Sequence, residues 1–538
     1  MRKIRFLLSG LLVFAMLSGL LAACGKQPAG DGGAQNAPAS EKVLTISSTN
    51  DIGTLNPHQY NSEMFAQDFV YENLLKYGKD GKIEPCLAET WEISPDGKVY
   101  TFHLRKGVKF SDGSDFNAEI VKKNYDAVLK ARDQHSWLEL VNQMDRTEAV
   151  DGSTFKIYFK NPYYPALQEL TLIRPMRILG AAGFLEDGDT SKDIKAPIGT
   201  GPWVLSEHKK GEYATFIRND NYWGEKPRLS KVIVKVIPDG ETAAAALEKG
   251  EIDMIYGSGV ISIDTFRELS KSGRFTTLTS DPMTTRVIGI NSNRGAAKDL
   301  SVRMALQYAV DKDSIVENIL YGTEKRADTL FAENFPYCKL GLEARGYDAE
   351  KAGKLLEDAG WKLQPGKDYR EKDGKALELD LCFIAADSVD RSIAEAIQAD
   401  CKKVGIKVNL VGEEEDSFYQ RQKNGDFGMI FGESWGAPYD PHSLVSSFRE
   451  PSHFDYQAQL GLPMKKAIDE TIGKVLISTD ESSRQKMYDY ILRTLHEQGV
   501  YLPISYRTNM AVFRKNVTGV TFATTNEIPL VNVDINQQ

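Results

Sequence analysis

The chain has 538 residues, of which 41% are hydrophobic and 26% charged, and its formal net charge is −9. This is an ordinary globular composition over a length too great for one hydrophobic core, so we expect two or more lobes. The acidic balance argues against nucleic-acid binding.

The first residues carry a pattern typical of export. Arg2, Lys3 and Arg5 precede an apolar run from Phe6 to Leu21 that is broken only by small residues. Such a run indicates a signal peptide rather than a membrane-spanning helix. We predict a signal peptide over residues 1–23, and its removal would take the formal net charge to about −12.

The end of this run resembles the lipobox of bacterial lipoproteins. It reads Leu21-Ala22-Ala23-Cys24, and in that motif the cysteine is acylated and becomes the mature N-terminus. Ordinary cleavage after Ala23 is the alternative, but it would leave an exposed thiol and give the next segment no purpose. We therefore expect acylation of Cys24, with palmitate or a similar chain, and attachment to the cell membrane.

Residues 24–42 comprise this cysteine and a segment rich in Gly, Ala, Pro and polar side chains. Such a composition cannot bury enough apolar surface to fold, so it predicts a flexible tether. No apolar stretch after the signal peptide reaches membrane-spanning length.

The other cysteines are scattered, without C-x-x-C spacing. They are Cys86, Cys338, Cys382 and Cys401. The spacing indicates neither a disulfide framework nor a thiolate metal cluster, so we expect buried free thiols.

Periodic patterns predict strands and helices from Val43 onward. Alternation predicts a strand over 43–47, and helical spacing predicts a helix over 64–75. Residues 88–113 alternate around a turn at 95–97, with Tyr100, Phe102 and Leu104 on one face, and a second turn follows at Asp112-Gly113. They predict a β-hairpin.

Helical patterns follow. Asn117 is expected to cap a helix that ends near Arg132. Further helices are predicted over 302–308 and over 349–359, the latter ended by Gly360.

A strand over 377–383, a helix with apolar residues from Val389 to Cys401, and a strand over 408–410 predict a β-α-β unit. These elements place the later half of the chain in an α/β lobe.

Five segments of the chain carry a family resemblance. They are the block at 88–113, IGTGPW at 198–203, RNDNYWGEKP at 218–227, ALEKGEIDM at 246–254 and VRMALQYAVDKDSIV at 302–316. Together they resemble the family-5 extracellular solute-binding proteins of ABC transporters. The resemblance covers essentially the whole mature chain. It implies an α/β, two-lobed periplasmic-binding-protein-like fold (class II, cluster C type) with a ligand cleft between the lobes.

The resemblance also implies that the chain crosses twice between the lobes, near residues 285 and 505. Lobe I would then comprise 43–285 and 505–538, and lobe II would comprise 286–504. The lobes are expected to close on the ligand by hinge rotation about these crossings.

Within this family, five motifs resemble those of the nickel-transport binding proteins. They are LNPHQY at 55–60, HSWLEL at 135–140, YYPALQEL at 163–170, WGAPYDPH at 435–442 and PSHFDYQAQ at 451–459. The resemblance implies that the ligand is lined by Tyr60, Met64, Trp137, Arg174, Trp435, Tyr439 and His453.

The histidines by themselves argue against a site for bare nickel. Ni²⁺ prefers four to six N or O donors, and the seven histidines include no His-x-His or His-x-x-x-His pair. A chelate would fill most positions and leave one for a protein imidazole. His453 is the candidate, because it matches the family's metal-ligating histidine; a lone loop histidine is otherwise usually solvated.

Arg174 and four aromatic residues have expected roles around the chelate. The guanidinium of Arg174 matches a carboxylate in two hydrogen bonds, although an ion pair is the commoner fate of an arginine. Tyr60, Trp137, Trp435 and Tyr439 would wall the cleft and stack on flat rings; aromatics at such spacings are otherwise core.

One position departs from the family pattern. The resemblance implies a second carboxylate-binding arginine directly before His135, where this chain has Gln134. Glutamine can hydrogen-bond a carboxylate but cannot neutralise it, a loss of roughly 1 to 3 kcal/mol. The preferred ligand is therefore expected to carry fewer carboxylates, and Arg132 is expected to point elsewhere.

The function expected from these features is capture of chelated nickel, as a Ni–histidine or Ni–metallophore complex, outside the cytoplasm. The chain would act as a monomer without a prosthetic group and deliver Ni²⁺ to the permease and ATPase subunits of an ABC transporter. An oligopeptide or dipeptide binder, which fixes peptide termini with an Asp and an Arg, is the alternative. A secreted hydrolase is disfavoured, because the chain has no G-x-S-x-G or His-Glu-x-x-His signature.

Overall fold

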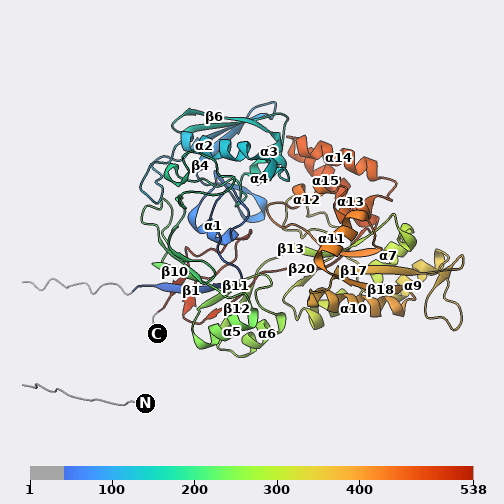
Figure 1. The fold of residues 1–538 in the computed structure, drawn as a ribbon. Helices are drawn as coiled ribbons and strands as arrows, with labels where there is room; N and C mark the ends of the chain where they lie inside the picture. The colour runs from blue at the N-terminus through green and yellow to red at the C-terminus, as the bar shows by residue number, and fades with distance from the viewer. Residues whose placement is uncertain (1–40, 537–538) are drawn as a thin grey trace, which may run out of the picture. The chain divides into compact units, whose positions relative to one another are not determined.

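The computed structural model describes residues 41–536, which belong to one compact unit. The predicted signal peptide, Cys24 and the tether up to residue 40 lie outside the described residues. The fold is α/β, as predicted, and is built on a seven-stranded and a six-stranded sheet with a smaller four-stranded sheet (Figure 1). Within residues 41–536, no helix combines the length and apolarity needed to cross a bilayer.

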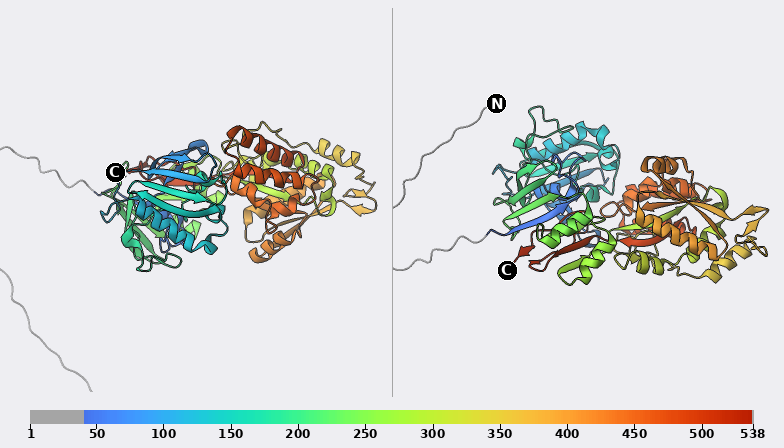
Figure 2. Two further views of the ribbon diagram at one scale, coloured as in Figure 1. Left: turned by 90° about the horizontal axis from the view of Figure 1, so that it is seen from above. Right: turned by 60° about the horizontal axis from the view of Figure 1, so that its bottom comes forward.

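The seven-stranded sheet contains the first strand of the described chain and a strand close to its C-terminal end. Its order is β12 (Phe275–Thr279), β21 (Met510–Arg514), β11 (Met254–Gly257), β1 (Val43–Ser48), β10 (Lys231–Val236), β9 (Tyr213–Arg218) and β8 (Trp203–Lys209). The first strand is parallel to β10 and β11. The Lys42 ammonium lies 2.7 Å from the Asp534 carboxylate, and Figure 2 shows the C-terminal end beside the blue first strand.

Helices pack on the faces of this sheet. Helix α5 (Gly240–Lys249) and helix α6 (Ile263–Lys271) form one core with β11 and β21, to which Leu247 and Phe266 contribute. Helix α1 (Met64–Val70) packs on β8, where the ring of Phe69 lies 6.2 Å from that of Trp203. The predicted first strand at 43–47 is confirmed.

The four-stranded antiparallel sheet confirms the predicted hairpin. Its order is β4 (Ala88–Ile93), β5 (Val99–Leu104), β7 (Thr154–Phe159) and β6 (Met144–Asp151). Tyr100, Phe102 and Leu104 are all buried on one face, under helix α2 (Ala118–Lys130). The Asn117 side chain accepts a hydrogen bond from Ile120 N at 3.1 Å, the predicted N-cap.

The six-stranded sheet is buried on both faces. Its order is β14 (Lys325–Arg326), β20 (Tyr501–Arg507), β13 (Thr284–Ile290), β19 (Met429–Glu433), β17 (Glu378–Ile384) and β18 (Lys407–Glu413). Because neighbouring residues of a strand face opposite ways, Leu381 and Phe383 join one core and Cys382 the other. Continuous apolar strands are the result.

Two groups of helices cover these faces. One comprises α7 (Leu300–Ala309), α9 (Ala349–Asp358) and α10 (Ser388–Lys403); the other comprises α11 (Glu415–Asn424), α12 (His442–Ser447), α13 (Phe454–Gln459), α14 (Lys465–Ile477) and α15 (Glu481–Glu497). Strands β17 and β18 are parallel and joined by α10, so the β-α-β prediction is confirmed. The predicted helices α7 and α9 are confirmed too, and Cys86, Cys338, Cys382 and Cys401 are buried free thiols.

Two short segments connect the large sheets. The chain leaves the seven-stranded sheet after Thr279 and enters the six-stranded sheet at Thr284; it returns between Arg507 and Met510. Residues 285 and 505, near which the crossings were expected, lie in β13 and β20. The two segments are hydrogen-bonded together, Ser280 N to Asn509 O at 3.0 Å and Met283 N to Arg507 O at 2.8 Å.

The predicted helix at 64–75 is wrong in its second half. Helix α1 ends at Val70, and Tyr71 has an extended backbone with φ −123° and ψ 155°. Leu75 belongs instead to β2 (Leu75–Tyr77), which pairs with β3 (Ile83–Pro85). Pairing with a strand outside the periodic window overrides the local helical pattern.

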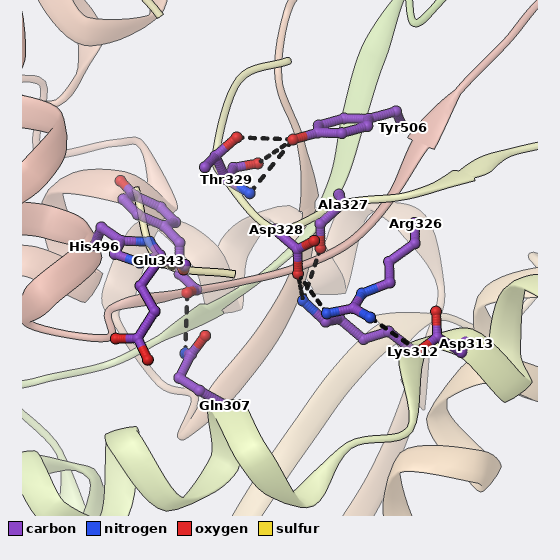
Figure 3. Close-up of polar contacts among 11 residues, drawn as sticks. Gln307, Lys312, Asp313, Arg326, Ala327, Asp328, Thr329, Glu343, His496 and Tyr506 are labelled. Carbon is purple, nitrogen blue, oxygen red and sulfur yellow. Dashed lines mark hydrogen bonds and ion pairs between the residues drawn. The ribbon is translucent and has the colours of Figure 1, made fainter. Parts of the chain in front are cut away.

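A buried ion-pair group ties β14 to the neighbouring helix α8 (Lys312–Ser314), as Figure 3 shows. The Lys312 ammonium is buried and donates to Asp328 at 2.9 Å and to the Ala327 carbonyl at 2.8 Å. The Arg326 guanidinium bridges Asp328 and Asp313. Each charge buried here therefore has a partner, as buried charges require.

The Asn117 cap provides a test of the fold. Replacing Asn117 with Ala should lower the free energy of unfolding by about 1 kcal/mol, because Ile120 N–H loses its acceptor at the start of α2. Chemical denaturation measures the change. The control is Asn117→Asp, which keeps an acceptor; equal losses in both variants would contradict the capping role.

Candidate functional site

Five of the predicted site residues form a continuous row of rings. The Tyr60 ring lies 5.8 Å from that of Trp137, Trp137 lies 6.3 Å from Tyr439, Tyr439 lies 6.1 Å from Trp435, and Trp435 lies 5.8 Å from His453. Residues up to 137 come from the half with the seven-stranded sheet, and the later three follow strand β19. The row thus joins both parts of the chain.

Trp137 and Tyr60 are the first members of the row. Trp137 lies between η2 (Arg132–His135) and α3 (Glu139–Gln143), and its indole is 49% exposed. Its Nε1–H donates to the Tyr60 hydroxyl at 2.9 Å. A large aromatic surface that remains exposed beside other rings is typical of a ligand site rather than of a core.

A tight turn after β19 positions Trp435 and Tyr439. The fully buried Asp440 carboxylate accepts from Trp435 N at 3.2 Å and from Gly436 N at 2.8 Å. Gly436 has φ +76°, and a Cβ there would lie 2.8 Å from Met283 O, so only glycine fits. Burial raises the pKa of Asp440 to about 7 despite the two backbone donors.

His453 is placed by its neighbour Phe454 at the start of α13. The Phe454 ring lies over two glycines of the central strands, where a Cβ on Gly289 or Gly432 would approach it to 2.6 Å or 2.4 Å. His453 itself is half-buried, and burial lowers the pKa of its imidazole. The ring is therefore neutral at pH 7, the state in which imidazole binds metals.

Arg174 is held against the first rings. Its Nη1 donates to the carbonyls of Tyr60 at 2.9 Å and Ser62 at 2.7 Å, and its guanidinium carbon lies 5.5 Å from the centre of the Tyr60 ring. No carboxylate within residues 41–536 forms an ion pair with it. Arg177 differs, because it is buried against Asp68 at 2.6 Å. Part of the Arg174 guanidinium thus remains available to a ligand, because within residues 41–536 only its Nη1 donates hydrogen bonds.

The remaining predicted residues lie around this group. Gln134 accepts from Gln59 at 3.0 Å and donates to Ser191 O at 3.3 Å, so it is a neutral, exposed neighbour of Trp137. Met64 is partly exposed at the first position of α1. Arg132 donates to the carbonyls of Asn142 and Met144, and so points elsewhere, as expected.

Two site-adjacent residues were not identified from the sequence. His135 is fully buried with its Nδ1 2.7 Å from the Tyr60 hydroxyl. Glu169, at the end of α4 (Ala166–Glu169), accepts from Leu140 N at 3.0 Å and from the Ser443 hydroxyl at 3.0 Å. His135 lies in the motif at 135–140 and Glu169 in the motif at 163–170. Membership of these motifs was the signal by which the sequence could have indicated the two residues.

Glu169 also links the two halves, because Leu140 follows Trp137 whereas Ser443 follows Tyr439. Burial raises the pKa of its carboxyl to about 7. The carboxyl lies where the row of rings passes from one half to the other.

A cavity of about 560 Å³ lies elsewhere, beside the crossings, and is lined by Ser392, Glu324, Arg286 and Arg507 among others. It contains none of the predicted site residues. Its two arginines are already paired with carboxylates, Arg286 with Glu324 at 3.0 Å and Arg507 with Glu433. The row of rings is thus the better candidate for a ligand site.

The side chains of this site can stack on a solute or hydrogen-bond to it, but they do not form a cluster of metal ligands. Within the described range 41–536, no group of three or more His, Cys, Asp or Glu side chains is arranged to hold a metal ion. A two-lobed α/β chain whose two parts share an aromatic site with one free guanidinium and one imidazole has the features of a solute-binding protein.

Comparison with known proteins gives the family. Residues 82–456 match the model of the bacterial extracellular solute-binding proteins, family 5. The chain belongs to this family. It is 48% identical over 501 residues to the nickel-binding periplasmic protein of Escherichia coli K12, covering 93% of this chain and 95% of that protein.

Two solved structures share the fold. NikA from Brucella suis in complex with Fe(III)-EDTA is 52% identical, with a TM-score of 0.88 over 92% of this chain and 100% of that one. NikZ from Campylobacter jejuni in complex with Ni(L-His) is 26% identical, with a TM-score of 0.72 over 91% of this chain and 99% of that one. The relatives are solute-binding transport proteins.

Glu169 should make stability depend on pH. Its pKa is about 7 when folded and 4.5 ordinarily, so its stabilisation is complete below pH 4.5 and is lost as the pH rises through 7. Between pH 5 and 8, the protein should lose about 1 to 3 kcal/mol of unfolding free energy relative to Glu169→Gln. Denaturation across this range measures it.

Glu395→Gln, at an exposed acid of α10 that is not among the groups around Glu169, is the control and should keep the pH slope of the unchanged protein. A Glu169→Gln variant with that same slope would show that Glu169 does not hold its proton in the folded state.

Proposed function

We propose that this protein captures nickel as a chelate outside the cytoplasm and delivers it to the permease and ATPase subunits of an ABC transporter. The observation that carries the proposal is the row of rings from Tyr60 to His453, with a neutral imidazole at one end and the free guanidinium of Arg174 at the other. A preformed chelate needs one further ligand for its metal ion and one group that binds its carboxylate. The imidazole and the guanidinium can supply these.

A chelate fits the site better than a bare ion does. Ni²⁺ prefers four to six donors, whereas the row offers one imidazole and the described residues hold no donor cluster. The missing ligands would therefore come with the metal. Two structurally similar proteins support this, because each was solved with a chelated metal, Ni(L-His) in one and Fe(III)-EDTA in the other.

The charge of the site favours a chelate with few carboxylates. Among the described residues, Arg174 is the one cation that lies over a ring of the row, whereas Arg132 lies against the carbonyls of Asn142 and Met144 and Gln134 is neutral. A single guanidinium neutralises one carboxylate. An amino-acid complex such as Ni–histidine, or a metallophore of similar charge, is the ligand that we propose.

Release to the transporter would use lobe movement. We place the hinge at 280–283 and 508–509, close to the crossings expected near 285 and 505, so that residues 43–279 with 510–536 form lobe I and residues 284–507 form lobe II. Closure would bring Arg174 and His453 to opposite sides of one chelate. The closed monomer would then present surfaces of both lobes to the permease, with nickel as cargo rather than as a prosthetic group.

Peptide binding is the second candidate. A peptide binder would offer an acid to the terminal ammonium, yet Asp440, which directly follows Tyr439, is fully buried and accepts from Trp435 N and Gly436 N. It is not free for a ligand. We also propose that the protein returns its solute unchanged, as its relatives among the solute-binding transport proteins support.

Substitution of His453 tests the metal ligand. Calorimetric titration of the chain from Glu41 onward should detect Ni²⁺ with excess L-histidine, but neither Ni²⁺ alone at comparable affinity nor a random tripeptide mixture. His453→Ala should weaken binding of the chelate at least about tenfold, because one coordination position is lost.

The matched control for that titration is His103→Ala, a change of a partly exposed histidine on β5 that should leave the affinity unchanged. Tight binding of tripeptides, or undiminished binding of the chelate by His453→Ala, would contradict the nickel-chelate proposal.

We further propose that acylated Cys24 anchors the protein to the cell membrane. The full chain should then sediment with membranes, and mass spectrometry should find acyl groups on the residue that follows Ala23. Cys24→Ser should release the protein from the membrane fraction without changing chelate affinity. Membrane association that survives this substitution would rule out the anchor.

A further inference from the structure

The Tyr60 hydroxyl lies between two ring nitrogens. The indole Nε1 of Trp137 is 2.9 Å from the Tyr60 oxygen, and the imidazole Nδ1 of His135 is 2.7 Å from it. An indole N–H can only donate, so the Tyr60 oxygen accepts from Trp137. The bond with His135 has two conceivable directions, because either partner can carry the proton.

The geometry favours Tyr60 as the donor to His135. A separation of 2.7 Å is typical of a hydroxyl donor, whereas a ring N–H usually lies about 2.9 to 3.0 Å from oxygen. The Tyr60 oxygen already accepts one bond, and hydrogen bonds that run in one direction strengthen one another. Burial lowers the pKa of His135 to about 4, so its ring is neutral at pH 7 and Nδ1 can carry a lone pair.

The two sides of the Tyr60 hydroxyl differ in exposure. His135 is 0% exposed, and because its Nε2 has no partner among residues 41–536, Nδ1 is the ring nitrogen that takes part in a hydrogen bond. Trp137 is 49% exposed and Tyr60 partly exposed. A hydroxyl that donates to Nδ1 would direct its proton into the protein and leave its oxygen to accept on the exposed side.

We propose that His135 is a positioning residue that makes Tyr60 a hydrogen-bond acceptor in the ligand site, so that the site selects chelates with an N–H donor next to a carboxylate. Tyr60 touches the ligand, and His135 acts through it. Without the acceptor at Nδ1, the hydroxyl could turn its proton outward and bind an acceptor instead.

The same geometry indicates the class of chelator. Arg174 lies against the ring of Tyr60, with its guanidinium carbon 5.5 Å from the ring centre. A carboxylate at Arg174 and a donor at Tyr60 would thus belong to neighbouring groups of one ligand. The α-amine and α-carboxylate of a metal-bound amino acid have this arrangement, because the coordinated amine keeps its N–H bonds. This ligand class rests on the proposed function of the site.

Substitutions at His135 separate positioning from structure. In His135→Leu the acceptor is lost, whereas in His135→Asn the side-chain oxygen stands near the place of Nδ1. Calorimetry with Ni–histidine, which carries N–H donors, and with Ni–EDTA, whose donor atoms carry none, should be run on the unchanged protein and both variants.

The expected result is a loss of about three- to tenfold for Ni–histidine in His135→Leu, with no loss for Ni–EDTA. His135→Asn should recover most of the affinity. Tyr60→Phe, which keeps His135 in place, should lose the same factor for Ni–histidine, and adding His135→Leu to it should change nothing more. Equal losses for both complexes, or no recovery with Asn, would overturn the positioning role.

Nitrogen-15 NMR of the imidazole, without ligand, checks the tautomer directly. His135 should show its proton on Nε2 and a hydrogen-bonded acceptor at Nδ1, and a proton on Nδ1 would overturn the inference even if nickel chelates bind. Failure of the proposed function would give another result, because the unchanged protein would then bind neither nickel complex. The proposed class of chelator would be wrong in that case, even if the NMR spectrum showed the expected tautomer of His135.

Discussion

The hydrogen bonds between the two crossing segments are the constraint on which the arrangement of the site depends. The segments at 280–283 and 508–509 carry the chain between the two large sheets, and Ser280 N to Asn509 O and Met283 N to Arg507 O keep them side by side. Two tethered passes restrict relative movement of the sheets far more than one linker would. The row of rings contains residues from both sides of these segments. The paired segments therefore hold its two parts in a defined position relative to each other.

The chemistry of the site follows from what its groups are already engaged in. Asp440 is occupied in holding its own turn, Arg177 in ion pairs and Arg132 in backbone carbonyls. Arg174 keeps part of its guanidinium free, and His453 keeps a neutral ring. The few uncommitted polar groups agree with the proposed ligand, because the metal ion of a chelate already has most of its donor atoms.

The elements that the sequence predicted are those with a strong local signal. Alternation around 95–97 marked the hairpin, and Asn117 marked the start of α2. The helix predicted over 64–75 continued past Val70 because nothing in its own spacing reveals that Leu75 pairs with Pro85. Long-range pairing of this kind lies beyond any local pattern.

The candidate site was predicted through motif resemblance rather than through spacing. No periodicity brings Trp137 next to Tyr439, which lies three hundred residues further along the chain. His135 and Glu169 stand inside the same motifs, but their roles depend on burial and on partners such as Tyr60 and Ser443. Both are properties of the folded chain, and a lone buried histidine or glutamate has no pattern of its own.

The contact of Phe454 with Gly289 and Gly432 reaches further than packing. Because His453 directly precedes Phe454, the depth at which that ring settles on the sheet sets how far the imidazole extends toward a ligand. Gly289 and Gly432 thus set the position of the ring that we propose as the metal ligand, although neither glycine has a side chain that could contact a solute. A substitution at either glycine would displace His453 and leave every residue of the row of rings unaltered.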